Sequence, residues 1–346
     1  MIRVPIPIEN VYYLFCYAWN RFEEAQALPV GGTESPDLPN LLAHVLLKGT
    51  SALLKRGLDR NFELVDGEIA TARGRIDLSI SLALRARNLR RLHCEFDEFR
   101  HDLLHNQILK ASLKRVAKAQ TIEQRLAQEL QNLARRMPDV RDITLERSSF
   151  SRVRLHRKNA YYAFMMKVAE LAFESLLPDP HGRGFLFYDV FRDEKKMARI
   201  FEEFVRNFYR LEQKSFAVGP LKIAWDATRV LPINHARLPD MRVDIYLRSL
   251  ERRIIIDTKY YKDVLQEFHG SESFHSGNLY QLFSYLKNAA GTDAAFENAE
   301  GILLYPCTDV RLDEHFMLQG HQVRIATVNL NQPWPKIRDQ LLGLIL

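Results

Sequence analysis

The sequence predicts an α/β protein, with an α+β domain over residues 1–165 and, over residues 166–346, a second domain whose central mixed sheet is flanked by helices. A length of 346 residues suits two domains of roughly 100–200 residues each. Helical periodicity dominates the first half, whereas helices and strands alternate after residue 185. The boundary falls either near a basic cluster at 147–158 or at the Pro/Gly-rich stretch 178–184.

Three long segments of the first half carry apolar residues at helical spacing: 10–27, 38–58 and 105–136. Gly57 follows the second segment as a C-cap, and Pro138 follows the third. A further apolar helix is expected over residues 160–177. Residues 62–77 are rich in turn signals, and we expect a strand–turn–strand finger there with Arg73 and Arg75 at its turn.

The second half opens with an amphipathic helix over residues 194–213, in which Phe201, Phe204 and Phe208 share a face. The remaining expected elements are strands at 222–225, 242–247 and 253–260, a helix at 279–287, strands at 301–305 and 322–329, and a helix from Trp334. This order indicates a mixed sheet with helices packed against it.

Composition describes an ordinary globular chain, with 47% hydrophobic and 27% charged residues. No run approaches the ~20 apolar residues of a membrane span, so we expect no membrane partner. The three cysteines, Cys16, Cys94 and Cys307, lack CxxC spacing, which argues against a zinc site or a disulfide framework and favours the cytoplasm. A net charge of +6 is a weak indication of a nucleic-acid partner.

Two acidic residues and a lysine interrupt the apolar strands at 241–247 and 254–261: Asp244, Asp257 and Lys259. Charged groups are costly to bury unless they are paired or bind a metal. A hairpin that folds about Leu250-Glu251 places Asp244 opposite Asp257, with Cβ atoms about 4.5–5.5 Å apart. Two carboxylates this close require a proton or a cation between them, and Mg²⁺ accepts one or two carboxylates while keeping several waters.

The neighbouring residues extend this site. Lys259 lies two residues beyond Asp257 and shares its strand face, where an ammonium can orient an attacking water and offset charge on a phosphate. The Thr258 carbonyl is a further expected metal ligand. Gln281 and Tyr285 are four residues apart on the following helix, and Gln281 is expected to reach the lysine as a catalytic residue. We therefore predict phosphodiester hydrolysis with Mg²⁺.

Several alternatives stay open at this point. Asp244, Asp257 and Lys259 could form surface ion pairs on an exposed hairpin, although the apolar run Ile254–Ile256 does not fit such a surface. Asp240 is a rival for the first acid. Glu202 and Glu203 could supply a third acid or simply occupy an exposed helix face. His275 is expected to cap a helix, and Tyr285 to belong to the core.

The chain resembles the McrC family, the nuclease subunits of McrBC modified-cytosine-specific restriction systems, nearly from end to end. The matching motifs are Ile8-Glu-Asn-Val-Tyr-Tyr-Leu-Phe-Cys-Tyr-Ala-Trp19, Gly74-Arg-Ile-Asp77, Ile256-Asp-Thr-Lys-Tyr-Tyr261, Phe274-His-Ser276, Asn278-Leu-Tyr-Gln-Leu282, Leu304-Tyr-Pro306 and Thr327-Val-Asn-Leu330. The resemblance implies a PD-(D/E)xK restriction-endonuclease-like fold with catalytic residues at Asp244, Asp257 and Lys259. The chain departs from the motif because Pro239-Asp240 is not adjacent to the acid within the strand.

The resemblance also implies a partner, a McrB-like hexameric AAA+ GTPase, and a substrate, double-stranded DNA containing modified cytosine. The N-terminal half of such proteins docks on the GTPase ring and stimulates GTP hydrolysis. This chain has no G-x-x-x-x-G-K-[ST] phosphate loop, so a nucleotide motor has to be another chain. The competing hypotheses are a stand-alone repair or resolvase nuclease and a catalytically silent adaptor of the GTPase. The long N-terminal half is difficult to explain for a stand-alone nuclease.

Overall fold

The computed structural model describes residues 6–21, 37–87, 89–137, 139–156, 159–182, 184–188, 193–228, 238–260, 265–268, 271–308 and 311–346. The chain divides into two units, one of residues 1–31 and 189–346 and the other of residues 32–188. The expected division at 165/166 differs from this one, because it falls inside helix α8 (Ala160–Ser175) and assigns the first helix to the other unit.

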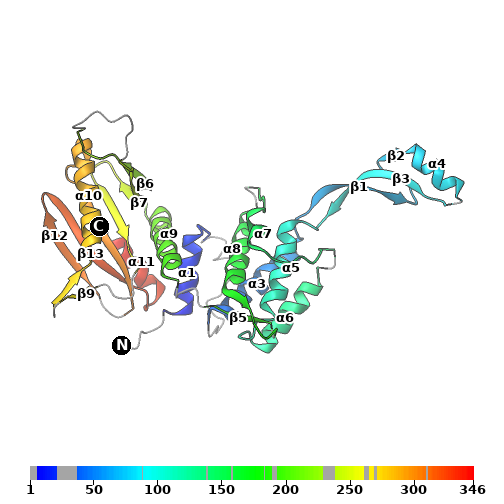
Figure 1. The fold of residues 1–346 in the computed structure, drawn as a ribbon, viewed down its shortest axis with the longest axis horizontal. Helices are drawn as coiled ribbons and strands as arrows, with labels where there is room; N and C mark the ends of the chain where they lie inside the picture. Colours follow the sequence, from blue (N-terminus) through cyan, green and yellow to red (C-terminus); the bar gives the residue numbers. More distant parts are fainter. Residues whose placement is uncertain are drawn as a thin grey trace. The chain divides into compact units, whose positions relative to one another are not determined.

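The unit of residues 1–31 and 189–346 is built on a six-stranded mixed sheet, which confirms the expected α/β architecture (Figure 1). Its strands are β6 (Ala217–Ile223), β7 (Met241–Arg248), β8 (Arg253–Thr258), β11 (Glu300–Cys307), β12 (Asp313–Leu318) and β13 (His321–Asn329). Their order is β12-β13-β11-β8-β7-β6, with β8, β11 and β13 parallel and the other pairs antiparallel. Strand β12 was not expected from the sequence. A separate hairpin joins β9 (Leu265–Phe268) and β10 (Ser271–Phe274).

Helices cover both faces of this sheet. The elements are α1 (Ile8–Ala18), α9 (Glu194–Glu212), α10 (Ser276–Thr292), the 3-10 turn η2 (Ala294–Phe296) and α11 (Trp334–Gly343). One core contains residues of α1, α9 and α11, and the other contains residues of α10. Ile254 and Ile256 face the first core and Ile255 faces the second, which explains the unbroken apolar run of β8.

Helix α1 belongs to this unit because its side chains complete the first core. Tyr17 is fully buried, stacks on Trp334 with ring centroids 5.3 Å apart, and donates a 2.6 Å hydrogen bond to Glu212. Asn10 donates a 2.8 Å hydrogen bond to the carbonyl of Leu330. The start of the chain is thus a structural part of the sheet unit, contrary to the expected domain assignment.

The unit of residues 32–188 is mainly helical. Its helices are α3 (Leu38–Arg56), α5 (Leu104–Val116), α6 (Gln124–Arg135), α7 (Arg147–Ser151) and α8, and a short hairpin joins β4 (Leu176–Pro178) to β5 (Phe185–Phe187). The single helix expected over 105–136 is two helices. The intervening residues bond elsewhere, since the Gln120 amide donates to the carbonyl of Phe185 and the Asn40 side chain binds the main chain at Thr121 and Glu123.

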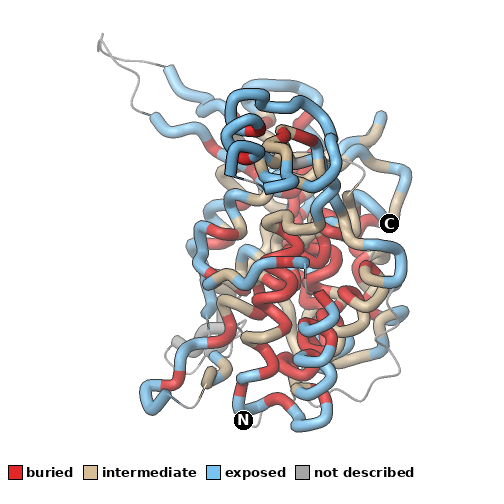
Figure 2. The backbone as a smooth tube through the Cα atoms, turned by 90° about the vertical axis from the view of Figure 1, so that its right-hand side faces the viewer, coloured by how far each residue is buried: buried red, intermediate tan, exposed pale blue. Residues whose placement is uncertain are grey.

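A finger projects from these helices (Figure 1) and is exposed over most of its length (Figure 2). It comprises β1 (Asn61–Ile69), β2 (Arg75–Asp77), α4 (Leu78–Ala86) and β3 (Leu92–Arg100). The two expected strands exist, but they do not pair with each other, because β3 lies between them. Gly74 has φ +65°, and a Cβ there would lie 2.3 Å from the carbonyl oxygen of Glu95, so this turn requires glycine.

The root of the finger is fixed by hydrogen bonds around Asp59. Its carboxylate accepts a 2.7 Å hydrogen bond from Asn159 and lies 3.1 Å from Nε2 of the buried His105. Its carbonyl accepts from Asn106, and its amide donates to the hydroxyl of Tyr162. The network ties the finger to helices α5 and α8. Across the described ranges of both units, no helix is long and apolar enough to cross a membrane.

Candidate active site

The hairpin of β7 and β8 has the register that brings the two acids together. Ile245 pairs with Ile256 and Leu247 pairs with Ile254. The pairing ends at Ile245 and Ile256, and Asp244 and Asp257 are the next residues on the two strands. The pairing agrees with the register expected from the sequence.

A β-bulge at Asp244 and Ile245 changes the direction in which the side chains of β7 point. Gly219 pairs with Tyr246 and Leu221 pairs with Val243, so Asp244 and Ile245 together oppose Pro220. Proline lacks the N–H that a regular ladder needs, and bulges tolerate it. Before the bulge Val243 faces the α10 core, and after it Ile245 faces the α9 core. Asp244 is exposed between these buried residues, at the point where the alternation changes phase.

A chain of polar contacts links Asp257 to helix α10. Lys259 Nζ lies 2.9 Å from Asp257 Oδ2 and donates a 2.8 Å hydrogen bond to Gln281 Oε1. Gln281 Nε2 donates to the hydroxyl of Tyr285 at 2.7 Å. The lysine amide donates to the carbonyl of Leu304, which extends the pairing of β8 with β11. The ammonium is thereby held by a carboxylate and an amide.

Asp257 and Lys259 carry charged groups in largely buried positions. The side chains of Asp257 and Lys259 are only 15% and 17% exposed. Burial raises the pKa of Asp257, the Lys259 charge opposes that rise, and the Asp244 charge adds to it. Oδ2 of Asp257 is buried, and its partner is the Lys259 ammonium at 2.9 Å.

A third acid, Glu202 of α9, belongs to the same electrostatic environment. Burial, and then the charge of Asp244, raise the pKa of Glu202 to about 6, while Arg206, 3.4 Å away, lowers it. The charges of Asp257, Lys259 and Asp244 also influence Tyr285, whose pKa is raised, mainly by burial. The sequence left Glu202 undecided, because only the packing of α9 on the sheet brings it near Asp244.

Other candidates lie in different surroundings. Asp240 is 59% exposed and its carboxylate lies 3.6 Å from Lys222 Nζ. Glu203 pairs with Arg199 at 3.7 Å along its own helix. His275 is the N-cap residue of α10 but makes no side-chain capping bond. Tyr261, part of the strand motif, lies outside the described residues.

Arg73 and Arg75 belong to the finger in the other unit and are not part of this site. The Arg73 guanidinium lies 4.8 Å from the ring centroid of Phe96 and donates to the carbonyl of Asp97. Arg75 pairs in register with Glu95 on the neighbouring strand. Both arginines are exposed.

A divalent cation at this site would need oxygen ligands from the acidic side chains. In the described part of the chain, no group of three or more His, Cys, Asp or Glu side chains is placed to hold a metal ion. Two carboxylates close enough for the charge of Asp244 to raise the pKa of Asp257 match Mg²⁺, which binds few protein ligands and keeps its waters. Thr258 closes β8 beside them and is half-buried.

The fold and the site define a mixed α/β protein with acidic, lysine and amide groups gathered at the end of one strand pair. A family model described as the McrBC 5-methylcytosine restriction system component matches residues 10–306, and the chain belongs to this family. The "Type IV methyl-directed restriction enzyme EcoKMcrBC" of Escherichia coli (strain K12) is 31% identical over 339 residues, covering 98% of this chain and 97% of that protein.

A solved structure shares the fold. It is the refined half-complex from a tetradecameric assembly of Thermococcus gammatolerans McrB AAA+ hexamers with bound McrC. The match has a TM-score of 0.61 at 16% identity and covers 97% of this chain and 76% of that one. At this identity the likeness concerns the fold alone.

Proposed function

We propose that this chain is the Mg²⁺-dependent endonuclease subunit of a GTP-driven, modified-cytosine-specific restriction complex, with a PD-(D/E)xK nuclease domain that hydrolyses DNA phosphodiesters. The observation that carries the proposal is the ion pair of Asp257 with Lys259, at the end of the β7–β8 pairing where Asp244 also lies. The methyl-directed restriction enzyme of E. coli, similar over nearly the whole chain, supports the substrate class. Such a substrate places the protein in the cytoplasm.

The chain's own residues divide the chemical work. Asp244 and Asp257, with the Thr258 carbonyl, would hold Mg²⁺, and the metal would supply the positive charge that polarises the phosphate and makes water more acidic. Lys259 orients the attacking water and offsets the charge that grows on the phosphate oxygens. Gln281, bonded to both Lys259 and Tyr285, holds the ammonium in place. Glu202 adds negative charge on the α9 side of the site.

The finger is the proposed docking element for a McrB-like AAA+ GTPase, whose GTP hydrolysis it stimulates. Its helix α4 exposes Leu78 (70%) and Leu82 (66%), and Arg73 and Arg75 lie on the adjacent turn and strand. Exposed apolar side chains next to cations fit a partner surface with apolar pockets and an acidic rim. The Thermococcus structure described as McrB hexamers with bound McrC supports this kind of partner.

The decisive experiment compares Asp257→Ala with the matched control Asp240→Ala. Each chain is combined with its GTPase partner, GTP, Mg²⁺ and a duplex containing modified cytosine, and both cleavage and GTP hydrolysis are measured. We expect Asp257→Ala to abolish cleavage and retain GTPase stimulation, because it removes a metal ligand but leaves the finger unchanged. Asp240→Ala should retain both activities.

Each of the other outcomes contradicts part of the proposal and identifies a different kind of protein or site. Cleavage by Asp257→Ala with Mg²⁺ present shows that the catalytic assignment is wrong. Cleavage by the wild type without partner or GTP identifies a stand-alone nuclease. A wild-type chain that stimulates the GTPase but never cuts modified DNA is an adaptor without nuclease activity.

A further inference from the structure

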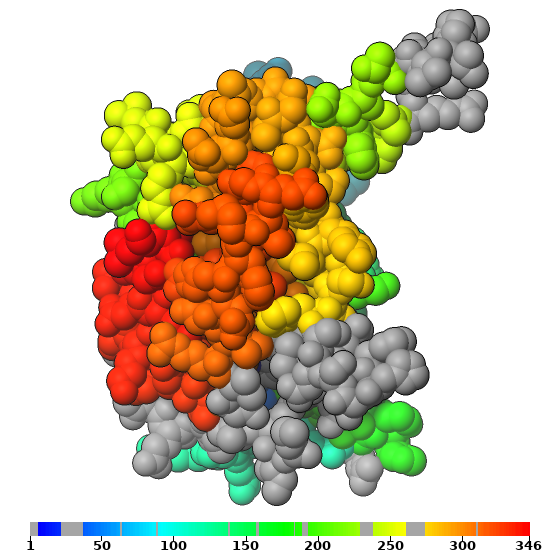
Figure 3. Space-filling model, turned by 90° about the vertical axis from the view of Figure 1, so that its left-hand side faces the viewer, coloured from blue at the N-terminus to red at the C-terminus, as the bar shows by residue number. Residues whose placement is uncertain are grey.

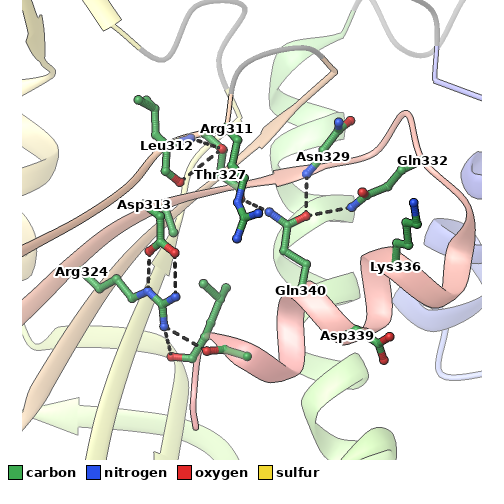
Figure 4. Close-up of a pocket in the computed structure, with 13 residues that line it drawn as sticks. Arg311, Leu312, Asp313, Arg324, Thr327, Asn329, Gln332, Lys336, Asp339 and Gln340 are labelled. Carbon is green, nitrogen blue, oxygen red and sulfur yellow. Dashed lines mark hydrogen bonds and ion pairs between the residues drawn. The ribbon is translucent and has the colours of Figure 1, made fainter.

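A pocket of about 420 Å³ opens between the β12–β13 edge of the sheet and helix α11, apart from the acids of the active site (Figure 4). Its walls come from the segment before β12, from β13 and from α11 with the turn that precedes it. On the face drawn in Figure 3, the C-terminal residues (red) lie beside the β12 segment (orange). The catalytic hypothesis assigns no role to this pocket.

The pocket has a rigid polar wall. Gln340 accepts hydrogen bonds from the Asn329 amide and the Gln332 side chain, and donates to the carbonyl of Thr327 (Figure 4). Arg324 binds both oxygens of Asp313, at 2.7 and 2.9 Å, and its remaining nitrogen donates to the carbonyls of residues 343 and 344. The hydrogen-bonding groups of Gln340, Arg324 and Asp313 already have partners. They therefore form a wall of the pocket and are not its ligand-binding groups.

Two further side chains that line the pocket are positively charged. Arg311 and Lys336 are exposed, and among the described residues neither side chain donates a hydrogen bond, although the charge of Arg311 acts on Asp313. The carboxylate of Asp313 is occupied by Arg324, and that of Asp339 lies 3.6 Å from Arg338, which also pairs with Glu212. The side chains of Arg311 and Lys336 can therefore donate hydrogen bonds to an anion.

The pocket and the catalytic lysine lie toward the same ends of the parallel strands but on different faces of the sheet. Thr258 is level with Leu304, and Leu304 with Ala326, so the end of β8 and the pocket wall on β13 are two strands apart. Lys259 contacts Gln281 of α10, whereas α11 on the other face lines the pocket. The pocket is therefore separate from the groups around Lys259.

We propose that Arg311 and Lys336 hold a backbone phosphate of the DNA outside the phosphodiester that is cut. This inference rests on the proposed nuclease function and adds a second, non-catalytic contact with the same substrate. The pocket positions the strand and reads no base, because a phosphate contact carries no sequence information.

The test measures the binding of an unmodified 20-base-pair duplex to the full-length chain, by fluorescence anisotropy between 50 and 200 mM salt. The variant Arg311→Ala/Lys336→Ala removes both cations. The control, Lys214→Ala/Arg248→Ala, removes two exposed cations near the β7–β8 turn, at the opposite end of these strands. Both double variants change net charge equally, so a general loss of positive charge affects them alike.

Loss of one phosphate contact reduces the slope of log affinity against log salt by about one. The ratio of wild-type to variant affinity should then shrink roughly fourfold between 50 and 200 mM salt for the pocket variant. The control should keep the wild-type slope. In the complete complex the pocket variant should cut modified DNA more slowly and stimulate the GTPase normally.

A pocket variant with the wild-type salt slope overturns the proposal, as does a wild-type chain that binds no duplex. Thermal stabilisation of the wild type by inorganic phosphate at constant ionic strength, with DNA binding unaffected by the mutations, identifies a site for free phosphate and also overturns it. Loss of GTPase stimulation with normal DNA binding assigns the pocket to a protein interface instead. In each case the Asp257→Ala result still decides the nuclease function independently.

Discussion

The end of the β7–β8 hairpin and the finger depart from ordinary protein surfaces in opposite ways. At the hairpin, charged groups are held in place near the core, and the ammonium of Lys259 is fixed by Asp257 and Gln281. On the finger, apolar groups such as Leu78 and Leu82 are exposed with little packed against them. Buried charge is costly without a counter-ion, and exposed apolar surface is costly without a partner.

Under the proposed function, each region lacks a different kind of component. The hairpin would have the protein groups of a site and lack an ion and a substrate. The finger has an anchored root at Asp59 and would lack a second protein surface. The proposed chemistry and its proposed control thus belong to different units of the chain, and substitutions can test each of them separately.

The largest expected effect comes from the same substitution made in both regions. Phe204 is fully buried in the α9 core, and Phe204→Ala should lower the free energy of unfolding of its unit by about 3–5 kcal/mol. Phe62 on the finger is 63% exposed and contacts Phe99, so Phe62→Ala should cost at most about 1.5 kcal/mol.

Tryptophan fluorescence during urea unfolding separates these two effects. Trp19, Trp225 and Trp334 all belong to the unit of residues 1–31 and 189–346. Phe204→Ala should move the tryptophan transition to lower urea, and Phe62→Ala should leave it in place. A shift of similar size for Phe62→Ala contradicts the independence of the two units.

The next largest effect concerns Lys259, at the end of the β7–β8 hairpin. Lys259→Ala removes the ammonium aimed at the developing charge and should slow single-turnover cleavage by roughly 10²–10³-fold. Lys222→Ala is the matched control, because Lys222 pairs with the exposed Asp240 outside the site. Rates are measured at saturating partner and Mg²⁺. A loss of less than tenfold for Lys259→Ala excludes the assigned role.

The smallest effect concerns the finger. Arg73→Ala/Arg75→Ala removes two exposed cations, and exposed charge pairs contribute roughly 0.2–1 kcal/mol each, so half-maximal GTPase stimulation should require about two- to thirtyfold more of this chain. Arg125→Ala on α6, where the side chain is 92% exposed, is the control. Unchanged stimulation by the double variant removes this turn from the interface.

Local sequence rules predicted much of the candidate site because strand geometry is short-ranged. Alternation with period two puts Lys259 on the face of Asp257, and the hairpin fold about Leu250-Glu251 follows from the spacing of the apolar strands. The i, i+4 spacing similarly predicted that Gln281 and Tyr285 would meet, and they do. The main helices and four of the six central strands were predicted for the same reason, and a fifth, β6, was expected at 222–225 but lies at 217–223.

The tertiary structure decided what depends on distant parts of the chain. Local patterns in the chain predicted the α/β class, the hairpin register and the shared face of Asp257 and Lys259. Folding alone brought Glu202 near Asp244, placed β3 between β1 and β2, and added α1 to the sheet unit. The physical reason is that side-chain periodicity reports which face of an element is buried, but not which distant element buries it.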